Sequence, residues 1–337
     1  MFLNELTKLS GVSGCEFEVR NYIKSKLSEM GCQFYVDKLG NIIAHNKGKK
    51  NKTIMVSAHM DEVGLIVTNI DSDGFIKFKA VGGIDQRVLN SKVVLIGENN
   101  IPGVIGSKAV HLMTEKEKGV SLPIDKLYID IGTSTKEETE KLVNIGDYAA
   151  FKSDYVEFGD NMIKAKALDN RVGCSIILEI LKEKLDVDFY GVFTVMEEVG
   201  LRGAETAAYQ LEPDLAIVLE GTVCADMPEV EEHENSTLIG KGAVLSLMDN
   251  ATVYDIDLVR RVAKIAEDNN IAYQYRRSTS GANDAGVIHK TKKGAKVVSI
   301  SVPCRYIHSS VSVASKNDLM SALKLTKQVI IENQKGE

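Results

Sequence analysis

Residues 53–62 read TIMVSAHMDE, a run of apolar, strand-forming residues that ends in His59, Asp61 and Glu62. The first six of these residues predict a β-strand. Ligands of open α/β sheets bind beyond the carboxyl ends of the strands, where side chains from separate strands converge. The polar residues after this strand are therefore candidates for a functional site.

Three other apolar runs lead into side chains of the same kinds. They are residues 191–196 before Glu197 and Glu198, residues 215–219 before Glu220, and residues 297–302 before His308. A fifth candidate, Asp169, stands where a predicted strand meets the start of a helix, and a helix N-terminus stabilises a carboxylate. The common position of these residues after strands favours one shared site over several separate structural roles.

Helical and strand-like segments alternate after residue 158. Helices are expected over residues 170–184, 203–209, 258–269 and 316–332, and strands over residues 189–196, 215–219 and 297–302. This alternation predicts an α/β fold in which a mixed sheet is covered by helices on both faces. The first 64 residues have the same mixed character and are expected to belong to the same sheet.

Residues 65–157 have a different texture. Short β-like runs separated by glycines dominate, for example LIV at 65–67 and KVVLI at 92–96, and one short helix is expected near residues 135–143. This pattern is typical of a small all-β, barrel-like domain. We therefore predict one catalytic domain formed by residues 1–64 and 158–337, interrupted by an inserted β domain at residues 65–157.

Composition and charge narrow the class of protein. The 337 residues are 44% hydrophobic and 26% charged, and a formal net charge of -6 argues against a nucleic-acid or anionic-membrane partner. We expect no membrane span, because no stretch approaches roughly 18 apolar residues, and no secretory signal at the start. Five cysteines without CxxC spacing are expected to be free thiols, which favours a cytoplasmic location.

The candidate residues are of the types that bind divalent metals. Histidines and carboxylates without a thiolate suit Zn²⁺, Co²⁺ or Mn²⁺ at a catalytic site. One bridging carboxylate, with one histidine and one further carboxylate for each metal, forms a two-metal hydrolase site that activates a shared water. Neighbours at a strand end point to opposite sides, so one of Glu197 and Glu198 is expected to bind metal and the other to accept a proton from the water.

Four segments carry a resemblance to a known family. They read SAHMDEVG at 57–64, KALDNR at 166–171, EEVGLRGA at 197–204 and RYIHS at 305–309. In this order, over nearly the whole chain, they resemble metallopeptidase family 42 of clan MH, the tetrahedral, glutamyl or deblocking aminopeptidases. The resemblance implies a di-zinc exopeptidase-like fold and a two-metal aminopeptidase that hydrolyses the N-terminal peptide bond of peptides.

The resemblance also implies a role for each matched residue. These roles are Asp169 as the bridging ligand, His59 and Glu220 at one metal, Glu198 and His308 at the other, Glu197 as general base, and Asp61 as the residue that orients His59. The implied cofactors are two divalent ions per subunit, Zn²⁺ or Co²⁺ with Mn²⁺ as a third option. A cis peptide bond between Asp169 and Asn170 is also implied. Many members carry aspartate in place of Glu220, which leaves the metal preference open.

The same resemblance gives the inserted β domain a role in assembly. It is similar to the dimerisation domain of a family that builds hollow tetrahedral dodecamers from dimers. From the residues alone, a small β insertion with exposed strand edges is expected to need a partner. The expected partners are therefore peptide substrates and further copies of the chain.

Two other functions are compatible with parts of the pattern. Paired carboxylates also serve glycan hydrolysis, and some relatives carry endoglucanase labels, although the chain has no Trp and only 6% aromatic residues to stack on sugars. A non-catalytic shell protein is the third interpretation, and such a protein is expected to have lost at least one ligand.

Two local motifs remain. The sequence SGCE at residues 13–16 predicts a capping box at the start of a helix. Residues 278–284 read STSGAND and either shape a substrate pocket or form a simple turn in which Asn283 caps a helix.

Overall fold

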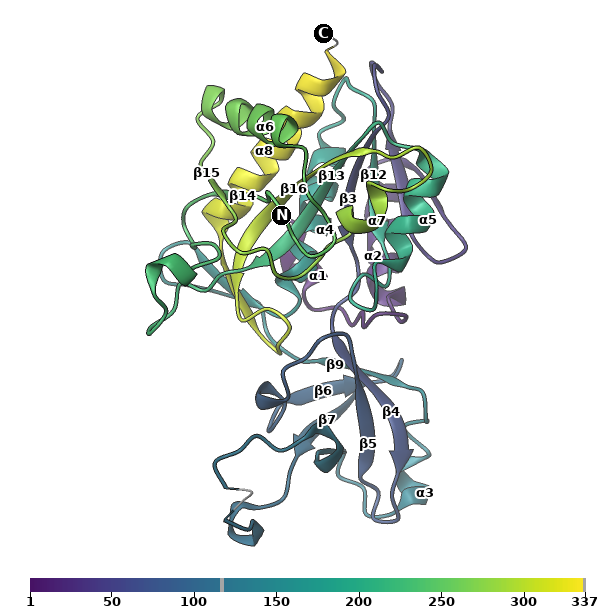
Figure 1. Ribbon diagram of the computed structural model, residues 1–337. Helices are drawn as coiled ribbons and strands as arrows, with labels where there is room; N and C mark the ends of the chain where they lie inside the picture. Colours follow the sequence, from purple (N-terminus) through teal and green to yellow (C-terminus); the bar gives the residue numbers. More distant parts are fainter. Residues whose placement is uncertain (116–117, 336–337) are drawn as a thin grey trace.

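A computed structural model describes residues 1–115 and 118–335 and contains one large mixed sheet within them (Figure 1). The strands of this sheet are β1 (Gln33–Val36), β2 (Ile42–Asn46), β3 (Ile54–His59), β10 (Val156–Phe158), β11 (Met162–Ala165), β12 (Phe189–Thr194), β13 (Leu215–Val223), β14 (Ala243–Leu245), β15 (Tyr273–Tyr275), β16 (Lys296–Arg305) and β17 (Ser312–Ser315). They run in the order β1-β2-β12-β3-β13-β16-β17-β11-β10, and β14 and β15 extend from β16.

The centre of this sheet is parallel and its margins are antiparallel. Strand β3 pairs in parallel with β12 and β13, and β13 pairs in parallel with β16. The pairs formed by β1, β2, β10, β11 and β17 are antiparallel. The carboxyl ends of the four central strands therefore meet at one edge, where the predicted site residues lie.

Helices cover the sheet on both sides, as predicted. They are α1 (Leu3–Leu6), α2 (Phe17–Glu29), α4 (Leu168–Lys182), α5 (Arg202–Leu211), α6 (Ile256–Asp268), α7 (Ala285–Ile288) and α8 (Lys316–Gln334), with the 3₁₀ turn η4 (Glu232–Glu234). Helix α3 (Lys136–Thr139) and the 3₁₀ turns η1 (Gln86–Val88), η2 (Val110–Leu112) and η3 (Ile124–Lys126) belong instead to residues 64–151, which form a separate barrel. The connections β11-α4-β12 and β12-α5-β13 run in opposite directions along the sheet, so right-handed crossovers place α4 and α5 on opposite faces. No helix in the described ranges is long and apolar enough to cross a membrane.

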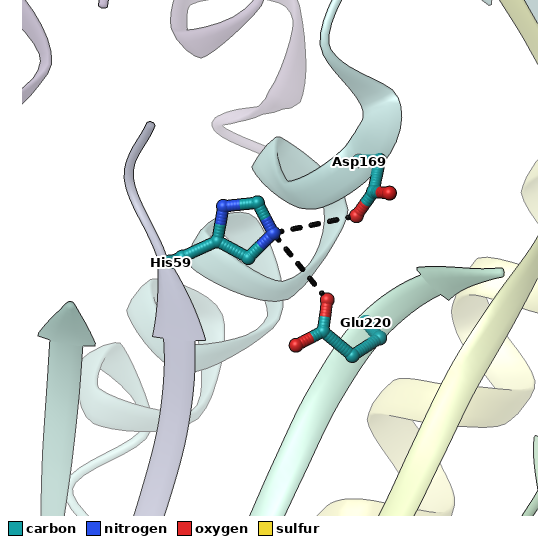
Figure 2. A group of neighbouring side chains, drawn as sticks. All are labelled: His59, Asp169 and Glu220. Atoms are coloured by element: carbon teal, nitrogen blue, oxygen red, sulfur yellow. Dashed lines mark ion pairs between the residues drawn. The ribbon is translucent and has the colours of Figure 1, made fainter. Parts of the chain in front are cut away.

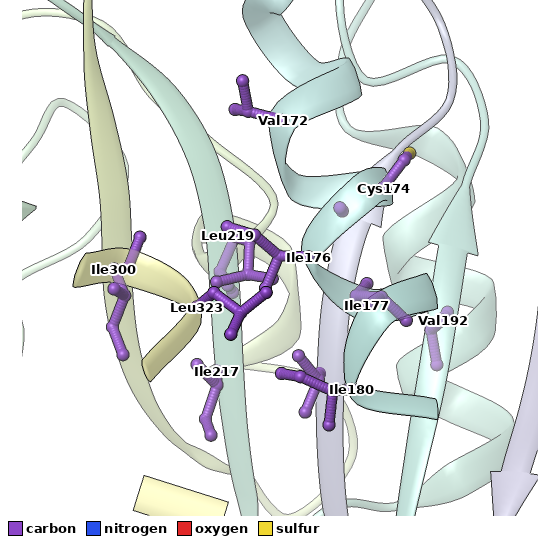
Figure 3. Close-up of a cluster of buried hydrophobic side chains, with 14 of the residues drawn as sticks. Val172, Cys174, Ile176, Ile177, Ile180, Val192, Ile217, Leu219, Ile300 and Leu323 are labelled. Carbon is purple, nitrogen blue, oxygen red and sulfur yellow. The ribbon is translucent and has the colours of Figure 1, made fainter. Parts of the chain in front are cut away.

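Helix α4 is the principal element of the hydrophobic core. Its residues Ile176, Ile177 and Ile180 are buried and pack toward Ile217 of β13 and Val192 of β12 (Figure 3). Burying such a side chain stabilises the fold by about 1.5–3 kcal/mol. The packing of α4 against the central strands fixes the start of the helix, and with it Asp169, at the carboxyl edge of the sheet.

A closed antiparallel barrel stands apart from the large sheet (Figure 1). Its strands are β4 (Gly64–Ile70), β5 (Ile76–Val81), β6 (Val93–Ile96), β7 (Ile101–Gly106), β8 (Tyr128–Asp130) and β9 (Tyr148–Phe151), closed in the order β4-β5-β8-β7-β6-β9. Inward residues such as Leu65, Val67, Phe78 and Ile129 form a second hydrophobic core. The predicted barrel-like insertion is thus present, while the domain boundaries at 64/65 and 157/158 stay a prediction.

Three expectations about strand ends were wrong. The strand expected over residues 189–196 ends as β12 at Thr194. The strand predicted to end at residue 219 continues as β13 to Val223, and the strand predicted to end at residue 302 continues as β16 to Arg305. Glu220 therefore lies within a strand instead of after it. The capping box predicted at residues 13–16 does not form either, because α2 begins at Phe17 without a side-chain cap hydrogen bond.

Candidate metal centre

The structure brings the predicted ligands together around Asp169. The Nε2 atom of His59, at the end of β3, lies 3.4 Å from Asp169 Oδ1 and 3.4 Å from Glu220 Oε2 (Figure 2). The Nε2 atom of His308 lies 3.6 Å from the other oxygen of Asp169, Oδ2, and 3.2 Å from Glu198 Oε2. The two oxygens of one carboxylate thus face two separate pairs, each made of one histidine and one glutamate.

Asp169 reaches this position through an irregular start of α4. Ala167 has a positive φ of 51°, and neither Asp169 nor Asn170 has helical dihedral angles. The peptide bond between Asp169 and Asn170 is cis, as the family resemblance implied. Strand β13 passes very close to it, since a Cβ atom added to Gly221 would lie 2.9 Å from Asp169 Cα. Only glycine fits at that position.

The expectation that Glu197 and Glu198 stand at the end of a strand was wrong. Strand β12 ends at Thr194, and Met196 has a positive φ of 55°, so both glutamates lie in a loop instead of at a strand end. Alternation along a strand therefore cannot separate their roles, and both side chains line the same cavity. Their contacts separate them: Glu198 lies against His308, whereas Glu197 Oε2 is 4.0 Å from His59 Nε2.

Asp61 faces the imidazole of His59 through both its backbone and its carboxylate. The Nδ1 atom of His59 lies 3.1 Å from the backbone oxygen of Asp61 and 3.4 Å from its carboxylate oxygen Oδ1. The Asp61 carboxylate accepts hydrogen bonds from the backbone N–H groups of Glu197 and Glu198, both at 3.1 Å, and from the Ser13 hydroxyl at 2.6 Å. The carboxylate therefore connects the loop of Glu197 and Glu198 to Ser13, in addition to facing the imidazole of His59.

Burial strongly perturbs the acids of the cluster. Burial raises the pKa of Glu197 well above its ordinary value, that of Glu198 to about 7 and that of Glu220 to about 8. Burial also opposes the charged form of His59, but the Glu197 and Glu220 carboxylates outweigh it and hold the pKa of His59 well above its usual range. For Asp169, the neighbouring His308 and His59 imidazoles outweigh burial and lower its pKa.

The cluster has the donor set of a divalent cation site. Two triads have ligand atoms within 4.8 Å of one another, namely His59, Asp169 and Glu220, and Asp169, Glu198 and His308. A third triad joins His59 with Glu197 and Glu198. Among the described residues, the buried atoms Asp169 Oδ1 and Glu220 Oε1 find no hydrogen-bond partner. Unpartnered buried carboxylate oxygens beside imidazole nitrogens are groups that a cation would satisfy.

A cavity of about 750 Å³ opens over the cluster and is lined by every predicted site residue except Asp61. Residues 280–283 also line it, and the side-chain oxygen of Asn283 accepts a hydrogen bond from Ala285 N, so this loop both shapes the pocket and starts α7. Sequence reasoning missed Gly83, which follows barrel strand β5. A Cβ atom there would lie 3.6 Å from Nδ1 of His308.

The fold and the cluster together define the metallopeptidase class, whose members use a divalent metal. The model of the M42 glutamyl aminopeptidase family matches residues 40–325, and the chain belongs to this family. It is a peptide hydrolase of the aminopeptidase type.

Relatives of similar length support this assignment. A protein of Acetivibrio thermocellus is 42% identical over 330 residues, which covers 97% of each chain. The lysyl aminopeptidase of Pyrococcus furiosus is 30% identical over 338 residues, covering 98% of this chain and 96% of its own. Both alignments include the barrel and the large sheet.

Solved structures share the whole fold. An aminopeptidase from the archaeon Desulfurococcus kamchatkensis superposes with a TM-score of 0.93 at 36% identity, covering 98% of this chain and 94% of its own. The TET1 peptidase of Pyrococcus horikoshii, described as assembling into a tetrahedron or a large octahedral shell, gives 0.87 at 34% identity, with 97% and 98% covered. A protein of Thermotoga maritima described as an endoglucanase gives 0.83 at 37% identity, with 99% and 98% covered.

Proposed function

We propose that this chain is a two-metal aminopeptidase that hydrolyses the N-terminal peptide bond of peptides. The observation that carries the proposal is the position of Asp169, whose two oxygens face two histidine–glutamate pairs. His59 and Glu220 would hold one ion, His308 and Glu198 the other, and Asp169 would bridge them. Two such ions would supply Lewis acids that acidify the attacking water and polarise the scissile carbonyl.

Glu197 is the proposed general base. It lines the cavity beside the cluster and lies farther from His59 Nε2 than Asp169 and Glu220 do, which leaves its carboxylate available to the water. Glu197 takes a proton from the water as the water oxygen bonds to the carbonyl carbon. It then gives that proton to the leaving amine nitrogen as the C–N bond breaks. Asp61 keeps His59 oriented through Nδ1.

A carboxylate of the cluster would bind the free α-amine of the peptide. This charge pairing would place the first peptide bond over Glu197 and restrict the enzyme to N-terminal residues. The cavity walls formed by residues 280–283 and by Ile307 would contact the N-terminal side chain. Glutamyl and lysyl activities both occur among the named relatives, so the preferred residue has to be measured.

The test is a panel of aminoacyl p-nitroanilides with chelated enzyme and with Zn²⁺, Co²⁺ or Mn²⁺ restored. Hydrolysis that disappears on chelation and returns with one of these ions supports the proposal. Activity that survives complete metal removal would falsify it. The native ion is taken to be the one that restores the highest kcat/KM at the lowest concentration.

Glycan hydrolysis is the second candidate because of the endoglucanase description of the Thermotoga maritima relative. A β-glucan arm in the same experiment separates the two functions. A glycosidase that uses paired carboxylates would keep its activity after chelation, whereas the peptidase would lose it. A chain inactive on both substrates would instead favour the non-catalytic shell protein.

We further propose that residues 65–157 mediate dimerisation and that dimers build a tetrahedral dodecamer. The descriptions of the horikoshii peptidase and of a related twelve-subunit TET1 structure support this assembly. Val93 and Val104 pair on adjacent barrel strands and are 39% and 47% exposed, an apolar surface that a partner would cover. Light scattering should give about 440 kDa, twelve times the 36.9 kDa chain. A monomer or isolated dimer would contradict this.

A cytoplasmic location is also proposed. All five cysteines are free thiols, Cys15, Cys32, Cys174, Cys224 and Cys304, as expected in a reducing compartment. Fractionation of cells that express the chain with its natural ends would test the location. Recovery in a secreted or membrane fraction would contradict it.

A further inference from the structure

The N-terminal segment, residues 6–16, runs along the edge of the sheet that carries the metal centre. Val12 forms a parallel β-bridge with Glu62, and the backbones of Gly11, Ser13 and Glu62 exchange hydrogen bonds of 2.9 and 3.2 Å. The Glu62 carboxylate also accepts from Gly11 N at 3.1 Å. The segment is therefore fixed to the turn that follows β3, three residues from His59.

One side chain of this segment contacts the loop that bears the tandem glutamates, and a second contacts Asp61, which accepts hydrogen bonds from that loop. The Ser13 hydroxyl donates to Asp61 Oδ2 at 2.6 Å, and the Glu16 carboxylate oxygen Oε1 accepts from Met196 N at 3.2 Å. Both residues are buried, with 3% of their surface exposed. The motif that reads as a capping box in the sequence is thus directed away from its own helix and toward the site.

The contact of Glu16 is one of three hydrogen bonds between distant carboxylates and the backbone of residues 196–198. Three consecutive backbone N–H groups, those of Met196, Glu197 and Glu198, each donate to a carboxylate oxygen from a distant segment. Glu16 receives the first, and the two oxygens of Asp61 receive the second and third. Such fixed donors set the direction in which the backbone, and with it each side chain, leaves the loop.

The loop has a conformation that needs external support. Met196 has a positive φ of 55°, which is unfavourable for a residue other than glycine and persists only where the surroundings enforce it. Charge-assisted hydrogen bonds from backbone N–H groups to carboxylates are about twice as strong as neutral ones. Glu16 and Asp61 hold Met196 and its neighbours in this conformation together with Asn41, whose side-chain oxygen accepts a hydrogen bond from Val195 N at 3.0 Å.

Position 14 of the SGCE motif is a glycine for a conformational and a steric reason. Its φ is +87°, and its N–H donates to Glu16 Oε1 at 2.7 Å, the same oxygen that accepts from Met196. A Cβ atom at Gly14 would lie 3.0 Å from the hydroxyl of Tyr148 in barrel strand β9. The backbone turns sharply here and fixes the Glu16 carboxylate between two donors.

We propose that Ser13 and Glu16 are positioning residues for the peptidase reaction. They hold Asp61 and the 196–198 loop so that Glu197 faces the cavity and Glu198 faces His308. This inference rests on the proposed function for the roles of Glu197 and Glu198. Removing a group that orients a metal ligand typically lowers metal affinity or activity roughly 10–100-fold.

Glu18, two residues beyond Glu16 in helix α2, provides a matched control. Its carboxylate accepts from Ser10 N at 2.9 Å and from Asn100 Nδ2 at 3.1 Å, so it fixes the segment to the barrel without contacting the 196–198 loop. Glu16→Ala and Glu18→Ala thus remove the same side-chain atoms two residues apart. A merely structural role of the segment would make the two variants behave alike.

The experiment measures kcat, KM and Co²⁺ affinity for Ser13→Ala, Glu16→Ala, Glu16→Gln and Glu18→Ala. We expect Ser13→Ala and Glu16→Ala to lower kcat roughly 10–100-fold with little change in KM, and to weaken Co²⁺ binding measured by calorimetry. Glu16→Gln should recover most of the loss, because its amide oxygen can accept both N–H groups. Glu18→Ala should match the wild type.

Three results would overturn the proposal: unchanged kcat and Co²⁺ affinity in Ser13→Ala and Glu16→Ala, equal losses in Glu18→Ala, or no recovery in Glu16→Gln. If Glu16→Ala fails to fold, Ser13→Ala and Glu16→Gln still decide the question. If the wild type hydrolyses no aminoacyl substrate, the proposed function fails. The Co²⁺ affinities of the variants would then still test the positioning of the ligands.

Discussion

The Oε2 atom of Glu197 lies 4.0 Å from the Nε2 atom of His59, and both atoms face the same cavity. The Asp169 and Glu220 carboxylates approach that nitrogen more closely, at 3.4 Å each. The longer distance distinguishes Glu197, the proposed general base, from Asp169 and Glu220, the proposed metal ligands. The distinction can be tested by replacing Glu197 with its neutral isostere.

Glu197→Gln should keep both metal ions and lose activity. The amide cannot accept the proton of the attacking water, so kcat should fall by roughly 10²–10⁴. Metal content after dialysis and kcat on an aminoacyl p-nitroanilide measure the two effects separately. Glu205→Gln, an exposed change on α5, is the control that should alter neither. Loss of one ion together with activity would instead make Glu197 a ligand.

Chelation should destabilise the folded chain. A cation that binds the native state at 100 times its Kd adds about 2.7 kcal/mol of stability, so a metal-free sample should unfold at a lower temperature. Differential scanning calorimetry with and without a chelator measures this shift in Tm. In Asp169→Asn, which removes the bridging carboxylate, chelation should have no further effect. An equal shift in that variant would mean that the ions bind elsewhere.

Metal affinity should rise between pH 6 and pH 9. Burial raises the pKa of Glu198 to about 7 and that of Glu220 to about 8, and nearby carboxylates overcome burial to raise the pKa of His308 to about 9. Below these values the groups are protonated, and a cation must displace the protons to bind. Calorimetric titration with Co²⁺ in buffers of different ionisation enthalpy counts the protons released. An affinity independent of pH would contradict the assignment of these ligands.

Glu220→Asp should weaken the binding of one of the two metal ions. Glu220 Oε2 lies 3.4 Å from His59 Nε2 and also accepts a hydrogen bond from Asn170 Nδ2 at 3.0 Å. Removing one methylene withdraws the carboxylate toward β13, and we expect about tenfold weaker binding, or about 1.4 kcal/mol. Competition titrations with Zn²⁺, Co²⁺ and Mn²⁺ would show whether the order of preference changes. Equal affinities in the two proteins would show that the longer side chain has no effect.

Gly221→Ala should disturb Asp169 directly. The added Cβ would lie 2.9 Å from Asp169 Cα, a distance that forces one backbone to move and costs about 1–3 kcal/mol. Both metal affinity and stability should therefore fall. Gly31→Ala is the control: Gly31 has a positive φ of 69°, but its Cβ would meet nothing within 4 Å, so only stability should fall. Normal metal binding by Gly221→Ala would contradict the close approach.

The sequence predicted the four central strands of the large sheet and the cluster at its edge because the ends of those strands are marked by abrupt changes from apolar to ligand-type residues. His59 was found in this way, and Asp169 by its place between a predicted strand and the start of a helix. The extension of β13 beyond Glu220 was not predicted, since a buried glutamate inside a strand looks like the end of one. The left-handed conformation at Met196 also leaves no local signal, so the strand-alternation argument for the tandem glutamates was wrong.

The role of residues 13–16 could not be predicted for a related physical reason. A serine followed three residues later by a glutamate satisfies a helix N-terminus as well as it satisfies a distant loop, and spacing alone does not distinguish these partners. Only the three-dimensional position of Met196 and Asp61 beside Ser13 and Glu16 does so. Contacts between segments more than a hundred residues apart are set by the packing of the whole sheet.

Through Gly83, the barrel contributes to the wall of the cavity at the metal centre. This residue belongs to the segment after β5, yet it forms part of the wall over His308. Strand β4 also begins at Gly64, directly behind the turn that carries Asp61 and Glu62. Excising the inserted module would therefore not leave a smaller working enzyme, because the cut would open one side of the reaction chamber.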